Sequence, residues 1–147
     1  MGSLALHLRR CLLVCALAAP VAALAFVDDA LSFAYEAANP YAERGWIIRE
    51  DAWGGDLPER GKKSVSAQLF RGNSYMFFLA TDVDGASLRV NIYDSEGNLA
   101  ESKSWQRGRF AYAEIKPRTT GTYHAIVEIL SSPEERTGWA LVYGFRQ

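Results

Sequence analysis

Two aspartates with the spacing of a metal site stand just before a glycine. Asp82 and Asp84 are two positions apart and precede Gly85. Residues two apart on an extended segment share one side, and Ca²⁺ takes oxygen ligands such as carboxylates. The pair is therefore a candidate calcium site, and no other cofactor is expected. The alternative is an aspartate-rich turn whose side chains bond to their own backbone.

Two tryptophans are candidate ligand-binding residues. Trp53 precedes Gly54-Gly55, and Trp105 precedes the polar segment 106–109, so both are expected to be partly exposed. An exposed indole ring presents a large flat apolar face, which can stack on a sugar. The alternative is that both rings cap the hydrophobic core, because tryptophan is buried to a large extent in most proteins.

Residues for nucleophilic catalysis or zinc binding are scarce. The chain has two histidines, His7 and His124, and two cysteines, Cys11 and Cys15. All but His124 lie near the N-terminus, and His124 stands alone in an alternating segment. Such a chain lacks a histidine-assisted nucleophile and the three or four ligands of a zinc site. We therefore expect a non-enzyme, and a small hydrolase using two carboxylates is the alternative.

The first 25 residues have the three-part pattern of a secretory signal peptide. Arg9 and Arg10 precede the apolar segment 11–24, and Ala25 is a small residue at the position that signal peptidase requires. The apolar segment is shorter than the ~20 residues that span a bilayer as a helix. We expect cleavage after Ala25 and a periplasmic or secreted mature domain, 26–147, without a membrane span.

Cleavage at this position would change the composition of the chain. It removes both cysteines, so the mature domain would have neither a disulfide nor a thiol. It also removes two of the 16 basic residues and none of the 17 acidic ones. The remaining domain is slightly acidic and has no basic tract, which leaves nucleic-acid binding without electrostatic support.

The elements that must position these residues are mostly strands. Apolar residues at three- and four-residue spacing predict one helix, 27–38, which Asn39-Pro40 should end. From there the period becomes two, with turn residues between the apolar runs. About eight strands are expected, at 46–51, 65–70, 75–80, 88–93, 99–105, 110–115, 123–129 and 139–145. Strands without interleaved helices predict a mainly β fold, an antiparallel sandwich or barrel.

Three local features refine this prediction. Residues 54–58, with two glycines and a proline, should end the first strand. Residues 94–98 should form a hairpin turn, with Gly97 or Asn98 at positive φ, that makes 99–105 the return strand of 88–93. The continuous apolar run 75–80 is typical of a central strand buried on both faces.

The order of motifs over 65–145 resembles the bacterial pre-peptidase C-terminal domain and its relatives. The run LRVNIYD at 88–94 follows an aspartate-rich turn, and GTY at 121–123 opens an alternating strand. The resemblance implies a jelly-roll-like β-sandwich that serves as an accessory module for substrate or surface binding. Some relatives bind calcium through acids placed just before the strand, where Ala86 and Ser87 stand in this chain.

Together these features predict an exported, non-enzymatic β-sandwich with a short N-terminal helix. Its expected partner is an extracytoplasmic glycan or an envelope protein. One alternative is a structural subunit of an envelope assembly that docks through the helix at 27–38. The other is the carboxylate-dependent hydrolase.

Overall fold

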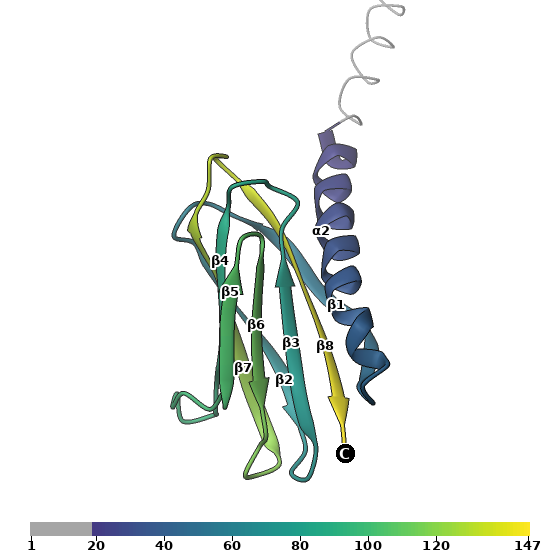
Figure 1. Ribbon diagram of the computed structural model, residues 1–147. Helices are drawn as coiled ribbons and strands as arrows, with labels where there is room; N and C mark the ends of the chain where they lie inside the picture. Colours follow the sequence, from purple (N-terminus) through teal and green to yellow (C-terminus); the bar gives the residue numbers. More distant parts are fainter. Residues whose placement is uncertain (1–18) are drawn as a thin grey trace, which may run out of the picture.

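The computed structural model describes residues 19–147, and their side chains from residue 28 onward. Residues 1–18 of the predicted signal peptide lie outside the described residues. The described chain forms one helix and eight strands (Figure 1). These are α2 (Ala19–Ala42), β1 (Ile47–Leu57), β2 (Lys62–Leu69), β3 (Ser74–Ala80), β4 (Ser87–Tyr93), β5 (Lys103–Arg107), β6 (Phe110–Ile115), β7 (Gly121–Ser131) and β8 (Thr137–Arg146).

The strands form two antiparallel sheets that pack face to face. The five-stranded sheet has the order β1-β8-β3-β6-β5, and the three-stranded sheet has the order β2-β7-β4. Apolar residues that alternate along the strands fill the space between the sheets; the largest include Phe77, Leu79, Leu88, Ile92, Val127, Ile129 and Leu141. The prediction of a mainly β antiparallel sandwich is confirmed. Within the described residues, no helix is long and apolar enough to span a membrane.

Helix α2 covers the outer face of the five-stranded sheet (Figure 1). Ala30, Ala34 and Ala38 recur every fourth residue, so they share one face of the helix, and all three are fully buried. They pack against a second apolar cluster that includes Phe78 and Tyr112. The sheet is therefore covered on both sides, and the prediction that 75–80 is buried on both faces is confirmed.

The helix is longer than the predicted range 27–38, and Pro40 lies inside it. Proline lacks the N–H of a helical hydrogen bond, but the helix continues past it to Ala42 because Tyr41 gains contacts there. The ring of Tyr41 lies 5.2 Å from Phe78 and 5.9 Å from Tyr112, between ring centroids. Packing of one aromatic side chain thus outweighs the local signal of the proline.

Strand β1 also runs past its predicted end. Gly54 and Gly55 do not break it but pair with Ala140 and Trp139 of β8. A Cβ atom on Gly55 would lie 3.4 Å from the Trp139 ring. At this distance a Cβ atom would be in ordinary van der Waals contact with the ring, so Gly55 is a paired strand residue here and not a turn residue.

The prediction that 99–105 is the return strand of 88–93 is wrong. The turn itself forms as predicted: the Asp94 N–H donates to the Asn98 carbonyl (2.9 Å), and Gly97 has φ +83°. Leu99 then makes a single bridge to Tyr93, after which the chain crosses to the five-stranded sheet as β5. Strand β5 pairs with β6 and not with β4.

Candidate ligand-binding groove

Three chain segments at one end of the sandwich form a groove, which we call the end groove. They are the β2–β3 turn, the β4–β5 connection and the β6–β7 loop, which lie together at the lower end of the molecule in Figure 1. The groove has a volume of about 1010 Å³. Its lining residues are Arg71, Gly72, Asp94, Leu99, Ala100, Glu101, Ser102, Ile115, Lys116, Pro117, Arg118, Thr119 and Tyr123. Sequence analysis missed this site because its walls come from three separate turns.

Hydrogen bonds hold two of these segments in place. The backbone N–H of Arg71 donates to Thr120 Oγ1 at 2.9 Å, which joins the β2–β3 turn to the β6–β7 loop. The hydroxyl of Tyr123 donates to the Thr119 carbonyl at 2.7 Å and braces the same loop against β7. The groove walls are therefore anchored to the sandwich.

Basic side chains in the groove have no ion-pair partner in the part of the chain that the structure describes. Arg71 lies on the β2–β3 turn, and Lys116 and Arg118 flank Pro117 on the β6–β7 loop; all three are exposed. No ion pair among the described residues includes any of them. The sequence does show that all three basic residues stand beside turn residues. It does not show that these turns lie together, because that depends on the arrangement of the strands.

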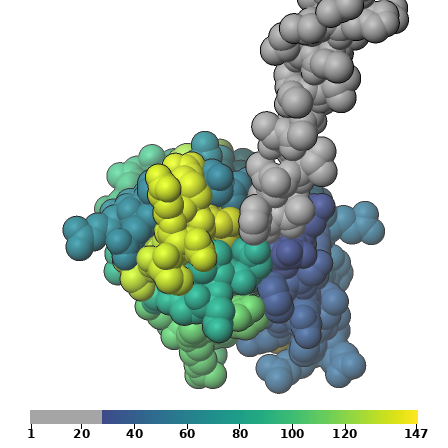
Figure 2. Space-filling model, turned by 90° about the horizontal axis from the view of Figure 1, so that it is seen from above, coloured from purple at the N-terminus to yellow at the C-terminus, as the bar shows by residue number. Residues whose placement is uncertain are grey.

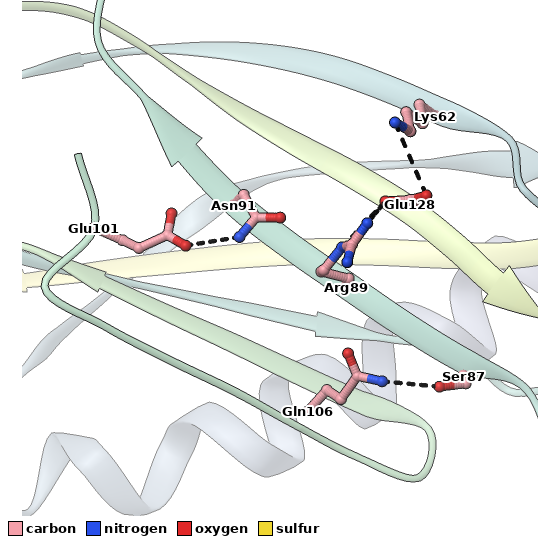
Figure 3. A network of polar contacts seen from close by, with 7 residues as sticks. All are labelled: Lys62, Ser87, Arg89, Asn91, Glu101, Gln106 and Glu128. Atoms are coloured by element: carbon pink, nitrogen blue, oxygen red, sulfur yellow. Dashed lines mark hydrogen bonds and ion pairs between the residues drawn. The ribbon is translucent and has the colours of Figure 1, made fainter. Parts of the chain in front are cut away.

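The two carboxylates of the groove are occupied by donors of the chain itself. Asp94 Oδ1 accepts hydrogen bonds from the backbone N–H groups of Glu96 (3.0 Å) and Asn98 (2.9 Å). Glu101 accepts hydrogen bonds from the Asn91 amide (2.7 Å, Figure 3) and from the Ile92 backbone N–H. Both acids thus hold the β4–β5 connection in shape, and the three basic side chains have charged groups free for a ligand.

The candidate tryptophans lie on opposite faces of the five-stranded sheet. Trp53 packs on the inner face against Tyr143, with 5.2 Å between ring centroids. Trp105 lies on the face that carries the helix, where it stacks on Tyr112 at 5.3 Å and 13°. Both rings are half-buried. They cannot form one common platform, so each remains a separate prediction of a ligand contact.

The polar groups around Trp53 connect parts of the protein to one another. The hydroxyl of Tyr143 donates to Asp51 Oδ2 at 3.1 Å, and Arg49 Nε donates to Asp51 Oδ1 at 3.2 Å. The bond from Arg49 lowers the pKa of Asp51, while burial raises the pKa of Tyr143. Tyr35 of the helix donates its hydroxyl proton to the Glu50 carbonyl at 2.7 Å. The pairing register of β1 with β8 shifts between Ile48 and Ala52, and this cluster fixes that irregular segment to its neighbours.

The candidate calcium residues have different surroundings. The Asp84 side chain is 97% exposed and forms an ion pair with Arg109 at 3.2 Å. Asp82 has a buried oxygen, Oδ1, without a hydrogen-bond partner, and burial raises its pKa. Ca²⁺ takes six to eight oxygen ligands, whereas the described residues contain no group of three or more acidic, histidine or cysteine side chains that could hold a metal. The donor set fits poorly, and calcium binding stays a prediction.

His124 lies beside a serine that the sequence analysis did not pair with it. The His124 Nδ1 and Ser66 Oγ atoms are 3.0 Å apart on neighbouring strands of the three-stranded sheet. Within the described residues, no carboxylate hydrogen-bonds to His124, so the pair lacks the third group that orients a catalytic base. We therefore assign the pair no catalytic role.

The outer face of the three-stranded sheet has its charges paired (Figure 3). Arg89 donates to Glu128 Oε2 at 2.6 Å, and Lys62 lies 3.9 Å from Glu128 Oε1. Gln106 of β5 donates to Ser87 Oγ at 3.1 Å and links the two sheets. This face therefore differs from the end groove, whose basic groups have no ion-pair partner among residues 28–147.

The protein is similar to known proteins in its structure but not in its sequence. No model of a known protein family matches the sequence, and no curated protein matches it. A periplasmic inhibitor of g-type lysozyme, PliG of Aeromonas hydrophila, is 12% identical with a TM-score of 0.50, over 65% of this chain and 85% of the inhibitor.

Two carbohydrate-binding modules are also similar in structure. TmCBM61, solved in complex with β-1,4-galactotriose, is 15% identical with a TM-score of 0.41, over 71% of this chain and 84% of the module. A β-1,3-glucan-binding CBM6 from Bacillus halodurans is 16% identical with a TM-score of 0.37, over 69% of this chain and 84% of the module. At such identities, likeness concerns the fold alone, because one fold supports many functions.

Proposed function

We propose that the protein is a non-enzymatic binding module that acts outside the cytoplasm and holds an anionic ligand in the end groove. The observation that carries this proposal is the charge arrangement of the groove. Arg71, Lys116 and Arg118 have no ion-pair partner among the described residues, while the carboxylates of Asp94 and Glu101 are occupied by internal donors. The extracytoplasmic location is proposed from the signal-peptide pattern of residues 1–25.

The size of the groove supports binding of more than a single ion. Pockets that hold small molecules measure roughly 300–1,000 Å³, and the end groove, at about 1010 Å³, is at the upper limit of that range. It has room for a segment of a polymer. Because its loops are anchored by the bonds of Arg71 and Tyr123, less conformational freedom is lost when a ligand binds.

Charge would also guide the ligand to the groove. The three basic side chains of the groove outnumber its two carboxylates, and an excess of one charge sign in a concavity raises the local concentration of an oppositely charged ligand and its association rate. The side chains are exposed, so this attraction should be screened within about 8 Å at physiological ionic strength. Binding that weakens as salt is added is therefore part of the proposal.

The proposal is tested with polymers of known charge. Isothermal titration calorimetry would measure binding to polyglutamate and polygalacturonate, which are anionic, and to galactan and β-1,3-glucan, which are neutral. We expect the anionic polymers to bind at low salt and the neutral ones to remain unbound. The double variant K116E/R118E should lose this binding by reversing two charges of the groove.

The matched control reverses two charges elsewhere. Lys63 and Arg107 are exposed, lie on β2 and β5 away from the groove lining, and belong to no ion pair of the described residues. The variant K63E/R107E changes the net charge by the same amount and should bind as the unmodified protein does. The proposal is wrong if no anionic polymer binds, or if both double variants lose binding equally.

A further inference from the structure

One exposed apolar side chain lines the end groove, and a second is the sequence neighbour of a lining residue. Leu99 lies in its wall and is 60% exposed, and Phe70, next to Arg71, is 52% exposed. Among the described residues, three large hydrophobic side chains are exposed to this degree, and the third is Ile47 on β1. The groove thus combines unpartnered positive charge with apolar surface.

The backbone forces Leu99 outward. Leu99 forms a bridge with Tyr93, and the next residue donates a hydrogen bond to the Ile92 carbonyl at 2.8 Å. In an extended segment neighbouring side chains point to opposite sides, and Ala100 packs against the core. Leu99 therefore faces the groove in a fixed position. A polar side chain at this exposed position would be hydrated by solvent, so folding does not require an apolar residue here.

This surface suits a polypeptide better than a polysaccharide. A leucine side chain can neither donate nor accept a hydrogen bond, so sugar hydroxyls placed on it would lose water without replacement. The aromatic residue of the groove lining, Tyr123, is 6% exposed and has no free ring face to stack on a sugar; the exposed ring of Phe70 does not belong to the lining. An acidic peptide can place carboxylates on the basic groups and an aliphatic side chain on Leu99.

We infer that the ligand of the end groove is an acidic polypeptide segment that carries aliphatic side chains between its carboxylates. This inference rests on the proposed function and narrows its ligand class. Arg71, Lys116 and Arg118 would receive the carboxylates. Leu99 would contact an aliphatic side chain and select such a segment over a purely charged one.

Two peptides of equal length and charge test the inference. One consists of glutamate with serine and the other of glutamate with leucine; polygalacturonate is the third probe. Calorimetry should show the leucine-containing peptide binding about tenfold more tightly than the serine-containing one, as expected from burying about half of a leucine side chain. The variant Leu99→Ser should remove this tenfold difference and leave binding of the serine-containing peptide unchanged.

The control is Ile47→Ser, because Ile47 is 56% exposed but lies on β1, outside the groove lining. It should preserve the tenfold difference. The inference is overturned if Leu99→Ser leaves that difference intact, or if polygalacturonate binds more tightly than both peptides; K116E/R118E would still weaken binding, so the proposed function would stand. If no anionic probe binds, the proposed function fails and the inference fails with it.

Discussion

The two ends of the sandwich differ in how their charged side chains are partnered. At the end with the groove, Lys116 and Arg118 have no ion-pair partner among the described residues. At the opposite end, Arg109 pairs with Asp84 at 3.2 Å and Arg136 with Asp56 at 2.7 Å. Arg60 and Arg107 at this opposite end, which we call the paired end, are likewise in no ion pair among the described residues, but they do not line the groove. The ion pairs join segments of the paired end to one another, whereas the basic side chains of the groove end line a concavity that a ligand can enter.

The paired end also contains one buried hydroxyl group that is fully hydrogen-bonded, although Asp82 Oδ1 at the same end has no hydrogen-bond partner among the described residues. Thr81 is fully buried; its hydroxyl donates to the Gly138 carbonyl at 2.6 Å and accepts from the Val83 N–H at 3.2 Å. Figure 2 shows this end from above, with helix α2 lying along one side of the strands. The difference between the two ends indicates that the loops of one sandwich can stabilise the fold at one end and bind a ligand at the other.

The largest expected effect on stability is at the paired end. Thr81→Val removes a hydroxyl that satisfies two backbone groups, so the free energy of unfolding should fall by about 1–3 kcal/mol. Urea denaturation measures this loss. The matched change at the groove end is Thr120→Val, which removes an exposed bond to the Arg71 N–H and should cost clearly less. Equal losses would contradict the division between the two ends.

Glu101 connects stability and binding at the groove end. Glu101→Ala leaves the Ile92 N–H and the Asn91 amide without their acceptor, which should lower the free energy of unfolding by about 1–2 kcal/mol. The same change removes a negative charge from the groove, so affinity for polyglutamate should rise. Glu101→Gln keeps one acceptor oxygen and should raise the affinity with a smaller loss of stability. A lower affinity in both variants would count against an anionic ligand.

A smaller effect should separate paired from unpartnered arginines. Arg136→Gln breaks the exposed pair with Asp56, so the melting temperature should fall slightly at low salt and less at high salt, because exposed pairs are weak and screened. Arg118→Gln should leave the melting temperature unchanged. Thermal unfolding at two salt concentrations compares the variants. A greater loss of stability in Arg118→Gln would show that the groove end has an internal partner after all.

The smallest effect concerns Asp82, whose pKa is raised above its ordinary value of 3.8 by burial and, less strongly, by Asp29, while a hydrogen bond from its own backbone and, more weakly, Arg109 oppose the shift. The folded state therefore binds the proton more tightly than the unfolded chain, and this carboxylate costs stability as pH rises through the raised pKa. Asp82→Asn should be more stable than the unmodified protein at pH 7, and the difference should vanish as pH falls below about 4.

The control for this pH dependence is Asp84→Asn, which removes the partner of Arg109 and should not stabilise the protein at pH 7. Melting curves between pH 3 and 7 would measure both variants. If the advantage of Asp82→Asn stays constant over this range, ionisation of Asp82 is not its cause.

Much of the fold could be predicted from local patterns. The range 110–115 coincides with β6 (Phe110–Ile115), and 75–80 differs from β3 by one residue. Alternation of apolar and polar residues is a property of consecutive positions, so a strand with one buried face is visible in the sequence. The error at Pro40 arose where the helix continues to Tyr41, which packs on Phe78. The error at Gly55 arose where pairing with β8 continues through residues that are typical of a turn.

Little of the candidate site could be predicted in the same way. The residues chosen for chemistry, Trp53 and Trp105, lie on opposite faces of one sheet. The residues that do meet, Arg71, Lys116 and Arg118, carried no motif. Their meeting depends on the order of strands in the two sheets, which the alternation pattern does not contain.

By itself, the sequence determined the strand-rich class, the alternation of each strand and the pattern of an export signal, because each depends on neighbouring residues. Only the tertiary structure decided which charges are partnered. Arg136 finds Asp56 from 80 positions away, and Arg118 finds no ion-pair partner among the described residues. Both side chains are arginines in polar loops, and the difference between them comes from the loops that the two sheets bring together at each end.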